Sequence, residues 1–489
     1  MEHSGPMPQG EIASRTSRAV PARQTNSRFS PLTRAFAVVL AVVVFAAQQH
    51  AAFAQQRRGL PVLRDAETEE LLRDYTRPIL KAAGLAQQNI EVVIINSRDF
   101  NAFVADGRRI FVNYGALYDS TTPNQIIGVL AHETGHIAGG HLSRLREQLA
   151  NAQTAAILMM LLGAAALAGG AVAGARGSDI GQAAPGVILG PSEVIRRTLL
   201  SYQRSQEEAA DRAAVTFLNA TGQSSIGMIQ TFSRFAQQQL FVTQQIDPYL
   251  LSHPTAQNRI AQLESLAQSS PYYNKKDPPE LQFRHDMMRA KISGFFDKPD
   301  VVMRRYPPSN ASLPAQYARA ISAYRWGNLK HAQELIDRLI QQMPRNPYFY
   351  ELKGQALLEA GRAREAIAPL RQAVELSRGA PLIRMMLGQA LVQSNDNSFA
   401  DEAIRELRFA LQREPNAPIG HRQLAIAYAR TGDRANADLA SATASFNEGD
   451  FKTAKLLATR AQTQFKYGTP GWLRADDIVK FQPPKLTKN

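Results

Sequence analysis

Two histidines and a glutamate at a fixed spacing are the residues of this sequence best suited to chemistry. His132, Glu133 and His136 form the pattern HExxH. In a helix, imidazoles four residues apart leave the same face one turn apart, so both can bind one ion. Imidazole suits Zn²⁺, and Glu133 is placed to take a proton from a water beside the metal. The pattern predicts zinc-dependent hydrolysis of peptides.

A third ligand must come from elsewhere in the chain. Metzincins carry a third histidine six residues after the second, but Leu142 occupies that position, and His141 falls one residue short. A later segment offers carboxylates, because Glu207 and Asp211 share a helical face at i, i+4. If Glu207 binds zinc, Asp211 can hydrogen-bond a ligand histidine and fix its tautomer. A solvated acidic helix face is the alternative explanation.

Several secondary-structure elements must position these residues. An apolar run at 126–131 predicts that the histidines project from a buried helix. Upstream, the pattern predicts an amphipathic helix at 65–83, ended by Gly84, and then a strand at 90–95. Two further strands are expected at 101–107 and 108–115, joined by an Asp-Gly turn. The outer strand of this small sheet could hold an extended substrate by backbone pairing, or the strands could simply cover the helix.

Together these motifs resemble the M48 family of zinc metallopeptidases. The resemblance rests on HETGHIAGGH at 132–141, RSQEEAAD at 204–211, and Ser-His-Pro at 252–254 with Arg259 beyond. It implies that the zinc ligands are His132, His136 and Glu207, that Glu133 is the catalytic base and that Asp211 is a supporting acid.

The same resemblance also implies that His253 lies on a loop near the metal. Relatives can use this histidine as a fourth ligand that shuts the site. A core or loop histidine without contact to the metal is the alternative.

Composition excludes some classes of protein. The 489 residues contain no cysteine, which rules out disulfides, thiolate metal sites and cysteine nucleophiles. The formal charge of +14 could favour nucleic acid or an anionic membrane. Because no nucleic-acid-binding module is recognisable, we expect no nucleic-acid partner and rank contact with a membrane surface higher.

The first 54 residues predict export. Five arginines precede an apolar run at 35–47, and Ala52-Phe53-Ala54 is a cleavage site of the A-x-A type. Residues 1–54 are therefore interpreted as a signal peptide with a long basic leader, the alternative being an uncleaved anchor helix. The mature protein is expected in the periplasm, with membrane association left open.

A metallopeptidase domain is expected at 55–267. Within it, residues 155–190 contain two apolar runs, interpreted as a helical hairpin that covers the active site or contacts a membrane. A true membrane span by 155–175 is the alternative. Residues 268–310 are rich in proline and predict a linker with one helix at 283–296.

The C-terminal part of the sequence is repetitive. Small residues at Ala320, Gly354 and Gly388 recur with a period of 34 residues, which is the tetratricopeptide period. Three residues are inserted within 394–398, after which the pattern resumes. We expect a repeat domain at 311–466 and a tail at 467–489. Such arrays form a curved solenoid that binds a peptide or partner, although a pure scaffold is the alternative.

The predicted fold is mainly α: a zincin-type helical domain with a small β-sheet, followed by a tetratricopeptide α-solenoid. The predicted function is an exported endopeptidase with one Zn²⁺, whose repeats recruit clients. The resemblance suggests unfolded or misassembled outer-membrane proteins, or their assembly machinery, as partners. Two alternatives remain: a chaperone or assembly scaffold whose metal site is shut, and an integral-membrane peptidase.

Overall fold

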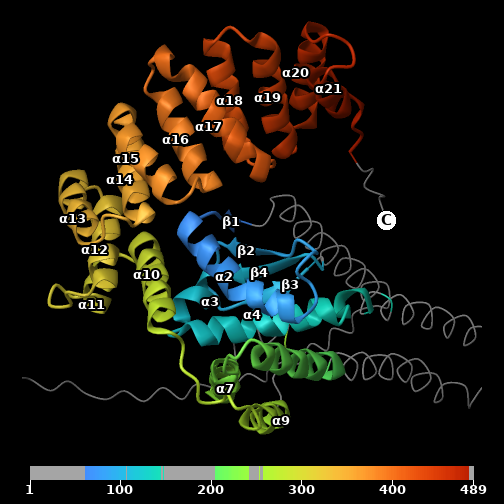
Figure 1. Cartoon of the computed structure of the whole chain (residues 1–489), viewed down its shortest axis with the longest axis vertical. Coiled ribbons are helices and arrows are strands. Elements are labelled where there is room, and N and C mark those ends of the chain that lie inside the picture. The colour runs from blue at the N-terminus through green and yellow to red at the C-terminus, as the bar shows by residue number, and fades with distance from the viewer. Residues whose placement is uncertain are drawn as a thin grey trace, which may run out of the picture. The chain divides into compact units, whose positions relative to one another are not determined.

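The computed structural model describes residues 61–105, 107–144, 147, 204–241, 253 and 257–483. The predicted signal peptide and the apolar hairpin at 155–190 lie outside these residues. The predicted fold class is confirmed, because one small sheet is accompanied by helices throughout (Figure 1). Among the described residues, no helix combines the length and the apolar character needed to cross a membrane.

The sheet has four strands in the order β1-β2-β4-β3. They are β1 (Val62–Leu63), β2 (Glu91–Ile95), β3 (Ala102–Val104) and β4 (Arg109–Asn113). β2 and β4 are parallel, whereas β3 pairs antiparallel with β4 in the register Phe103↔Phe111. The predicted hairpin is present, and Gly107 in its turn has a φ of +76° that glycine adopts without strain. β1 and β3 are the outer strands of this sheet.

Two helices pack on the sheet and on each other: α2 (Ala66–Ala82) and α4 (Pro123–Ala138) (Figure 1). Asp65 caps α2, because its side chain accepts a hydrogen bond from the Thr68 amide at 2.8 Å. The short helix α3 (Tyr114–Asp119) links β4 to α4. α4 carries HExxH, and most of its residues are buried in the core, which fixes the direction of its histidines.

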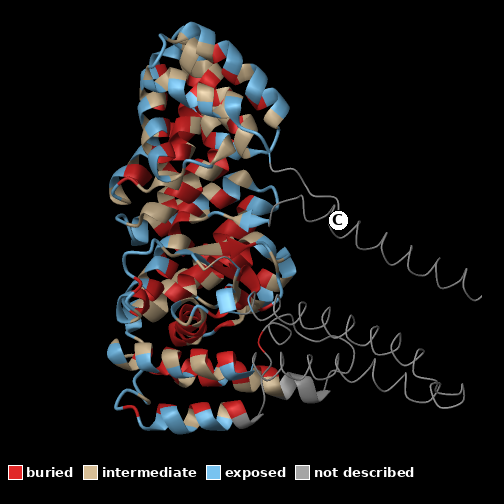
Figure 2. Cartoon of the chain, turned by 90° about the vertical axis from the view of Figure 1, so that its right-hand side faces the viewer, coloured by how far each residue is buried: buried red, intermediate tan, exposed pale blue. Residues whose placement is uncertain are grey.

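Three later helical segments complete this part of the chain: residues 204–220, α7 (Ile226–Phe241) and α9 (Gln257–Gln268). α7 packs closely on α4, since a Cβ on Gly128 would lie 2.5 Å from Cβ of Met228. Buried residues run through both this part and the repeat helices (Figure 2).

The segment predicted as a linker is mostly helical. It contains α10 (Pro279–Phe296) and α11 (Pro299–Arg305), so the single helix predicted at 283–296 starts earlier and is followed by a second. Proline at the first helical position begins a helix rather than breaking it, which explains the difference. α10 packs against α3 and α2 as well as against the first repeat helix, and thereby joins the two parts of the molecule.

The repeats form successive packed helices. They are α12 (Leu313–Arg325), α13 (Leu329–Gln342), α14 (Pro347–Glu359), α15 (Ala363–Leu376), α16 (Pro381–Gln393), α17 (Ala400–Arg413), α18 (Pro418–Arg430), α19 (Arg434–Asn447), α20 (Phe451–Gln464) and α21 (Pro470–Lys480). Small residues permit the packing, because a Cβ on Gly354 would lie 2.4 Å from Cγ of Leu370. The predicted insertion holds a short 3₁₀ turn, η1 (Asn397–Phe399).

The predicted tail at 467–489 is corrected by α21. Thr469 caps this helix, and its buried Ala475 packs in a small core with Leu439 of α19. The last helix therefore covers the end of the repeat stack rather than leaving it open.

A buried group of ionisable side chains joins α2 and α10 to the repeats. We call Asp65, Glu67, Lys291, Tyr317 and Glu351 the junction cluster. Lys291 Nζ lies 2.5 Å from Asp65 Oδ2, 3.2 Å from Glu67 Oε2 and 3.8 Å from Glu351 Oε2. Tyr317 donates a hydrogen bond of 3.0 Å to Glu67. Burial raises the pKa of Glu351 to about 8 although Lys291 opposes the shift.

Candidate metal centre and active site

α4 directs two imidazole nitrogens to one point. The Nε2 atoms of His132 and His136 are 3.1 Å apart, as the i, i+4 spacing predicted. His132 is fully buried, and the ring of Phe232 meets it edge to face at 5.5 Å between centroids. A buried helix with a packed neighbour holds the rings rigidly.

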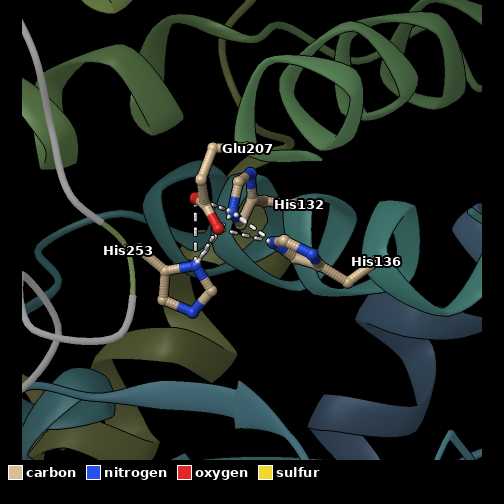
Figure 3. Close-up of side chains that lie close together, drawn as sticks. All are labelled: His132, His136, Glu207 and His253. Atoms are coloured by element: carbon tan, nitrogen blue, oxygen red, sulfur yellow. Dashed lines mark hydrogen bonds and ion pairs between the residues drawn. The ribbon is translucent and has the colours of Figure 1, made fainter. Parts of the chain in front are cut away.

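The helix over 204–220 brings Glu207 to the same point. A Cβ on Gly135 would lie 2.8 Å from the backbone oxygen of Ala210, so glycine at 135 is what lets the two helices approach so closely. Glu207 Oε2 is 3.3 Å from His132 Nε2, and Oε1 is 3.3 Å from His136 Nε2 (Figure 3).

His253 supplies a fourth atom. Its Nδ1 lies 3.4 Å from His132 Nε2 and 3.1 Å from Glu207 Oε2, and the four side chains converge in Figure 3. The other ring nitrogen, Nε2, is 3.3 Å from Oε1 of Glu133. His253 therefore lies between the carboxylate that would hold a metal and the carboxylate that would act as base.

Several separations between these atoms are close to those around a tetrahedral zinc ion. Ligand atoms about 2.0–2.1 Å from such an ion lie roughly 3.4 Å from one another. The four donor atoms here, from His132, His136, Glu207 and His253, all lie within 4.8 Å of one another, and their shortest separations are 3.1–3.4 Å. Two or three imidazoles with one carboxylate are a typical donor set for zinc.

Further contacts fix the carboxylates and the first histidine. Asp211 Oδ1 lies 2.9 Å from His132 Nδ1, on the side of the ring opposite the convergence point. Arg259 pairs with Asp211 and also places Nη1 3.1 Å from Glu207 Oε2. The sequence motif that contains Arg259 does not predict this role, because the residue is noticeable there only by its position after His253. A buried guanidinium that contacts both carboxylates fixes their positions relative to each other.

His141 was excluded as a metal ligand, and the structure places it outside the group of four. It is nevertheless buried, and its Nδ1 lies 2.9 Å from Nδ1 of His136. The structure thus brings all six predicted site residues together: His132, Glu133, His136, Glu207, Asp211 and His253. Their catalytic and metal-binding roles stay predictions.

The surroundings shift the pKa values of His132, His136 and Glu207. Burial alone lowers the pKa of His132, but hydrogen bonds to Asp211 and Glu207 outweigh it and raise that pKa to about 9. Burial lowers the pKa of His136 to about 4, against the opposing hydrogen bond from Glu207. Burial favours neutral Glu207, yet the surrounding histidines hold its pKa well below the usual range. The cluster therefore holds an anionic carboxylate, and an entering cation must displace the proton on His132.

Glu133 differs from Glu207 in its surroundings. It is fully buried, and burial raises the pKa of its carboxyl although His253 and His132 oppose the shift. A carboxylate with a raised pKa binds a proton more readily, which is what a general base requires.

The site and the fold together are those expected of a metallopeptidase domain. Residues 65–267 match the model of peptidase family M48, so this part of the chain is an M48 peptidase domain.

The chain is also similar to curated proteins with a wider match. The "Beta-barrel assembly-enhancing protease" of Yersinia pestis is 24% identical over 358 residues, which cover 71% of this chain and 70% of that protein. The protein of the same name from Escherichia coli (strain K12) is 24% identical over 348 residues, covering 69% and 68%. A Vibrio cholerae relative is 24% identical over 303 residues, and this chain spans only 60% of its length.

Proposed function

We propose that this chain is an exported zinc-dependent endopeptidase that cleaves unfolded or misassembled envelope proteins. One observation carries the proposal: donor atoms of His132, His136, Glu207 and His253 lie within 4.8 Å of one another, and the carboxylate of Glu133 lies 3.3 Å from His253. When bound, a zinc ion supplies positive charge that polarises a peptide carbonyl and acidifies water.

The side chains around the ion would have separate roles in binding, orientation and proton transfer. His132 and His136 would hold the ion through Nε2, and Glu207 would hold it through its carboxylate. Asp211 accepts the Nδ1 hydrogen of His132 and so keeps Nε2 free to bind. Glu133 accepts a proton from the attacking water and later donates it to the leaving amine. The outer strand β3 would offer a backbone edge for an extended substrate.

His253 would close the resting site. It takes the position that a water or substrate would need, and it contacts the base Glu133 at 3.3 Å. Hydrolysis then requires His253 to move away, which makes the enzyme self-limiting until a client arrives.

The clients are proposed from the relatives and the repeats. Proteins similar over 69–71% of the chain are named beta-barrel assembly-enhancing proteases, so outer-membrane proteins or their assembly machinery are the proposed partners. The repeat helices would recruit or orient them. The predicted signal peptide supports a periplasmic location, and contact of 155–190 with a membrane stays part of the proposal.

Replacing the base tests the chemistry directly. Glu133→Gln keeps the shape of the side chain but cannot accept the proton, so we expect casein hydrolysis to fall by about 10²–10⁴-fold. Zinc content, measured in parallel, should stay at the wild-type level because Glu133 is not a ligand. Wild-type rates of cleavage by this variant would contradict the mechanism.

The contact of His253 favours one second candidate, a chaperone or assembly scaffold whose metal site is permanently shut. Under that function neither wild type nor His253→Ala would cleave casein, while binding of unfolded protein would persist in both. If wild type or His253→Ala cleaves casein, and adding Glu133→Gln abolishes that cleavage, this second candidate is excluded.

A further inference from the structure

His141 lies against the metal-ligand histidine His136, on the side away from the convergence point. Nε2 of His136 faces Glu207 and His132, which leaves Nδ1 pointing outward. That outward nitrogen lies 2.9 Å from Nδ1 of His141, with the two ring planes at 83°. The contact is therefore a hydrogen bond, in which one Nδ1 donates and the other accepts.

A two-residue glycine turn after α4 precedes this contact. α4 ends at Ala138, and Gly140 follows with a φ of +62°, a left-handed conformation that suits glycine. The ring of His141 then lies over Gly139, where a Cβ would be 2.2 Å from its Nε2. Both glycines are thus required: one for the turn and one for the space that the ring fills.

Two further observations hold His141 in place. Its side chain is only 6% exposed. Its backbone oxygen accepts a hydrogen bond of 3.3 Å from the side chain of Gln206, the residue before Glu207. His141 is therefore tied to both helices that supply the metal donors.

We propose that His141 is a positioning residue for His136: its Nδ1 accepts the Nδ1 hydrogen of His136, so that the lone pair on Nε2 points at the metal. This inference rests on the proposed function. It gives each ligand histidine its own partner, because Asp211 occupies the equivalent place on His132 at 2.9 Å. Such outer contacts orient the ring and select the tautomer that can bind a metal.

Two substitutions of His141 that give side chains of similar shape can distinguish the effect of its hydrogen bond to His136 from the effect of its packing. In His141→Asn an amide oxygen can take the δ1 position and still accept, whereas in His141→Leu a methyl group takes it. Zinc affinity would be measured by competition with a chelator, with urea unfolding of the metal-free proteins as a check on folding. We expect His141→Leu to weaken zinc binding by about 10–100-fold, and His141→Asn to stay within about threefold of wild type.

Gly139→Ala provides an independent variant if His141→Leu folds poorly. Gly139 has a φ of −73°, which alanine adopts readily, but the added Cβ must displace the ring of His141. This variant should lose as much affinity as His141→Leu. Wild-type affinity in both variants, or equal losses in His141→Asn and His141→Leu, would overturn the inference and leave the proposed function intact. A wild-type protein that binds no zinc would overturn the proposed function itself.

Discussion

Within the part of the chain that the structure describes, two buried groups combine carboxylates with basic side chains, and they differ in how the negative charge is compensated. In the junction cluster, three carboxylates surround Lys291, whose ammonium group belongs to the chain. In the metal centre, Glu207 is surrounded by imidazoles whose Nε2 and Nδ1 atoms converge on a point. Burying a carboxylate is costly unless a cation compensates it. Each group contains a cation of the chain, Lys291 in one and Arg259 in the other, but only the second also brings imidazole nitrogens together at one point, where we propose that a metal ion binds.

The difference shows how a structural cluster can be told from a binding site. A lysine ammonium group donates hydrogen bonds and has no lone pair, so Lys291 in the junction cluster cannot act as a metal ligand. Neutral imidazoles offer lone pairs, and their mutual spacing of 3.1–3.4 Å matches that around a zinc ion. The predictions below change one cluster at a time, beginning with the largest expected effect.

Glu207→Ala should abolish metal binding. This carboxylate contacts all three histidines of the centre, and its loss removes both a ligand and the negative charge that attracts a cation. We expect zinc affinity to fall by more than the roughly 100-fold that loss of an outer contact costs, and casein hydrolysis to vanish with it. Chelator competition checks the affinity. Zinc bound by this variant as tightly as by wild type would place the metal elsewhere.

Lys291→Met should destabilise the fold without changing zinc affinity. Methionine has a similar volume but leaves the buried carboxylates without their cation, which costs about 3–5 kcal/mol. Urea unfolding measures the loss. Lys353→Met is the matched control, because Lys353 pairs with Asp337 at 2.6 Å while its side chain is 29% exposed, so its pair should contribute little. Equal losses of unfolding free energy in the two variants would show that Lys291 contributes no more to stability than the exposed Lys353.

Glu351 should make stability depend on pH. Its pKa is about 8 in the folded state against an ordinary value of 4.5, because burial and the neighbouring carboxyls of Asp65 and Glu67 outweigh the opposing charge of Lys291. Between these values the folded protein retains a proton that the unfolded chain has released, so stability falls as pH rises and levels off above the upper value.

Glu351→Gln removes this contribution. Between pH 5 and 7, the free energy of unfolding of the variant should rise relative to that of wild type by roughly 1 kcal/mol per pH unit. Urea unfolding at each pH measures this difference. Glu365→Gln, at an exposed position, should leave the wild-type slope unchanged. Parallel pH profiles of wild type and Glu351→Gln would mean that Glu351 is ionised throughout.

His253→Ala should have the smallest effect of these substitutions, and it should raise casein hydrolysis rather than lower it. Removing the fourth side chain opens the position beside Glu133, so casein hydrolysis should rise several-fold, whereas zinc affinity should fall only slightly because His132, His136 and Glu207 remain. A fall in hydrolysis at saturating zinc would instead make His253 a helper of catalysis.

Local spacing is what made the centre of the site predictable. His132 and His136, like Glu207 and Asp211, are related by one helical turn, and a turn of helix has the same geometry in any protein. The position of His253 followed only from family resemblance. The roles of Arg259 and His141 could not be predicted, since they depend on how separate helices pack. The Gly139-Gly140 pair was a visible signal for a reversal, but the sequence did not show what the turned chain would contact.

The same reasoning applies to the fold. The 34-residue period predicted the repeats because each unit repeats its small residues at the places where helices approach. The junction cluster joins Asp65 to residues of α10 and α14, and no local pattern reports contacts across such separations. The helix in the predicted tail was missed although Thr469 and Pro470 are a typical helix start.

The most direct test is the position and amount of zinc in the purified mature protein. Elemental analysis combined with anomalous X-ray scattering at the zinc edge should find one ion per chain, between His132, His136 and Glu207, in both wild type and Glu133→Gln. Protein that remains free of zinc in excess metal, or an ion bound away from these three side chains, would contradict the account.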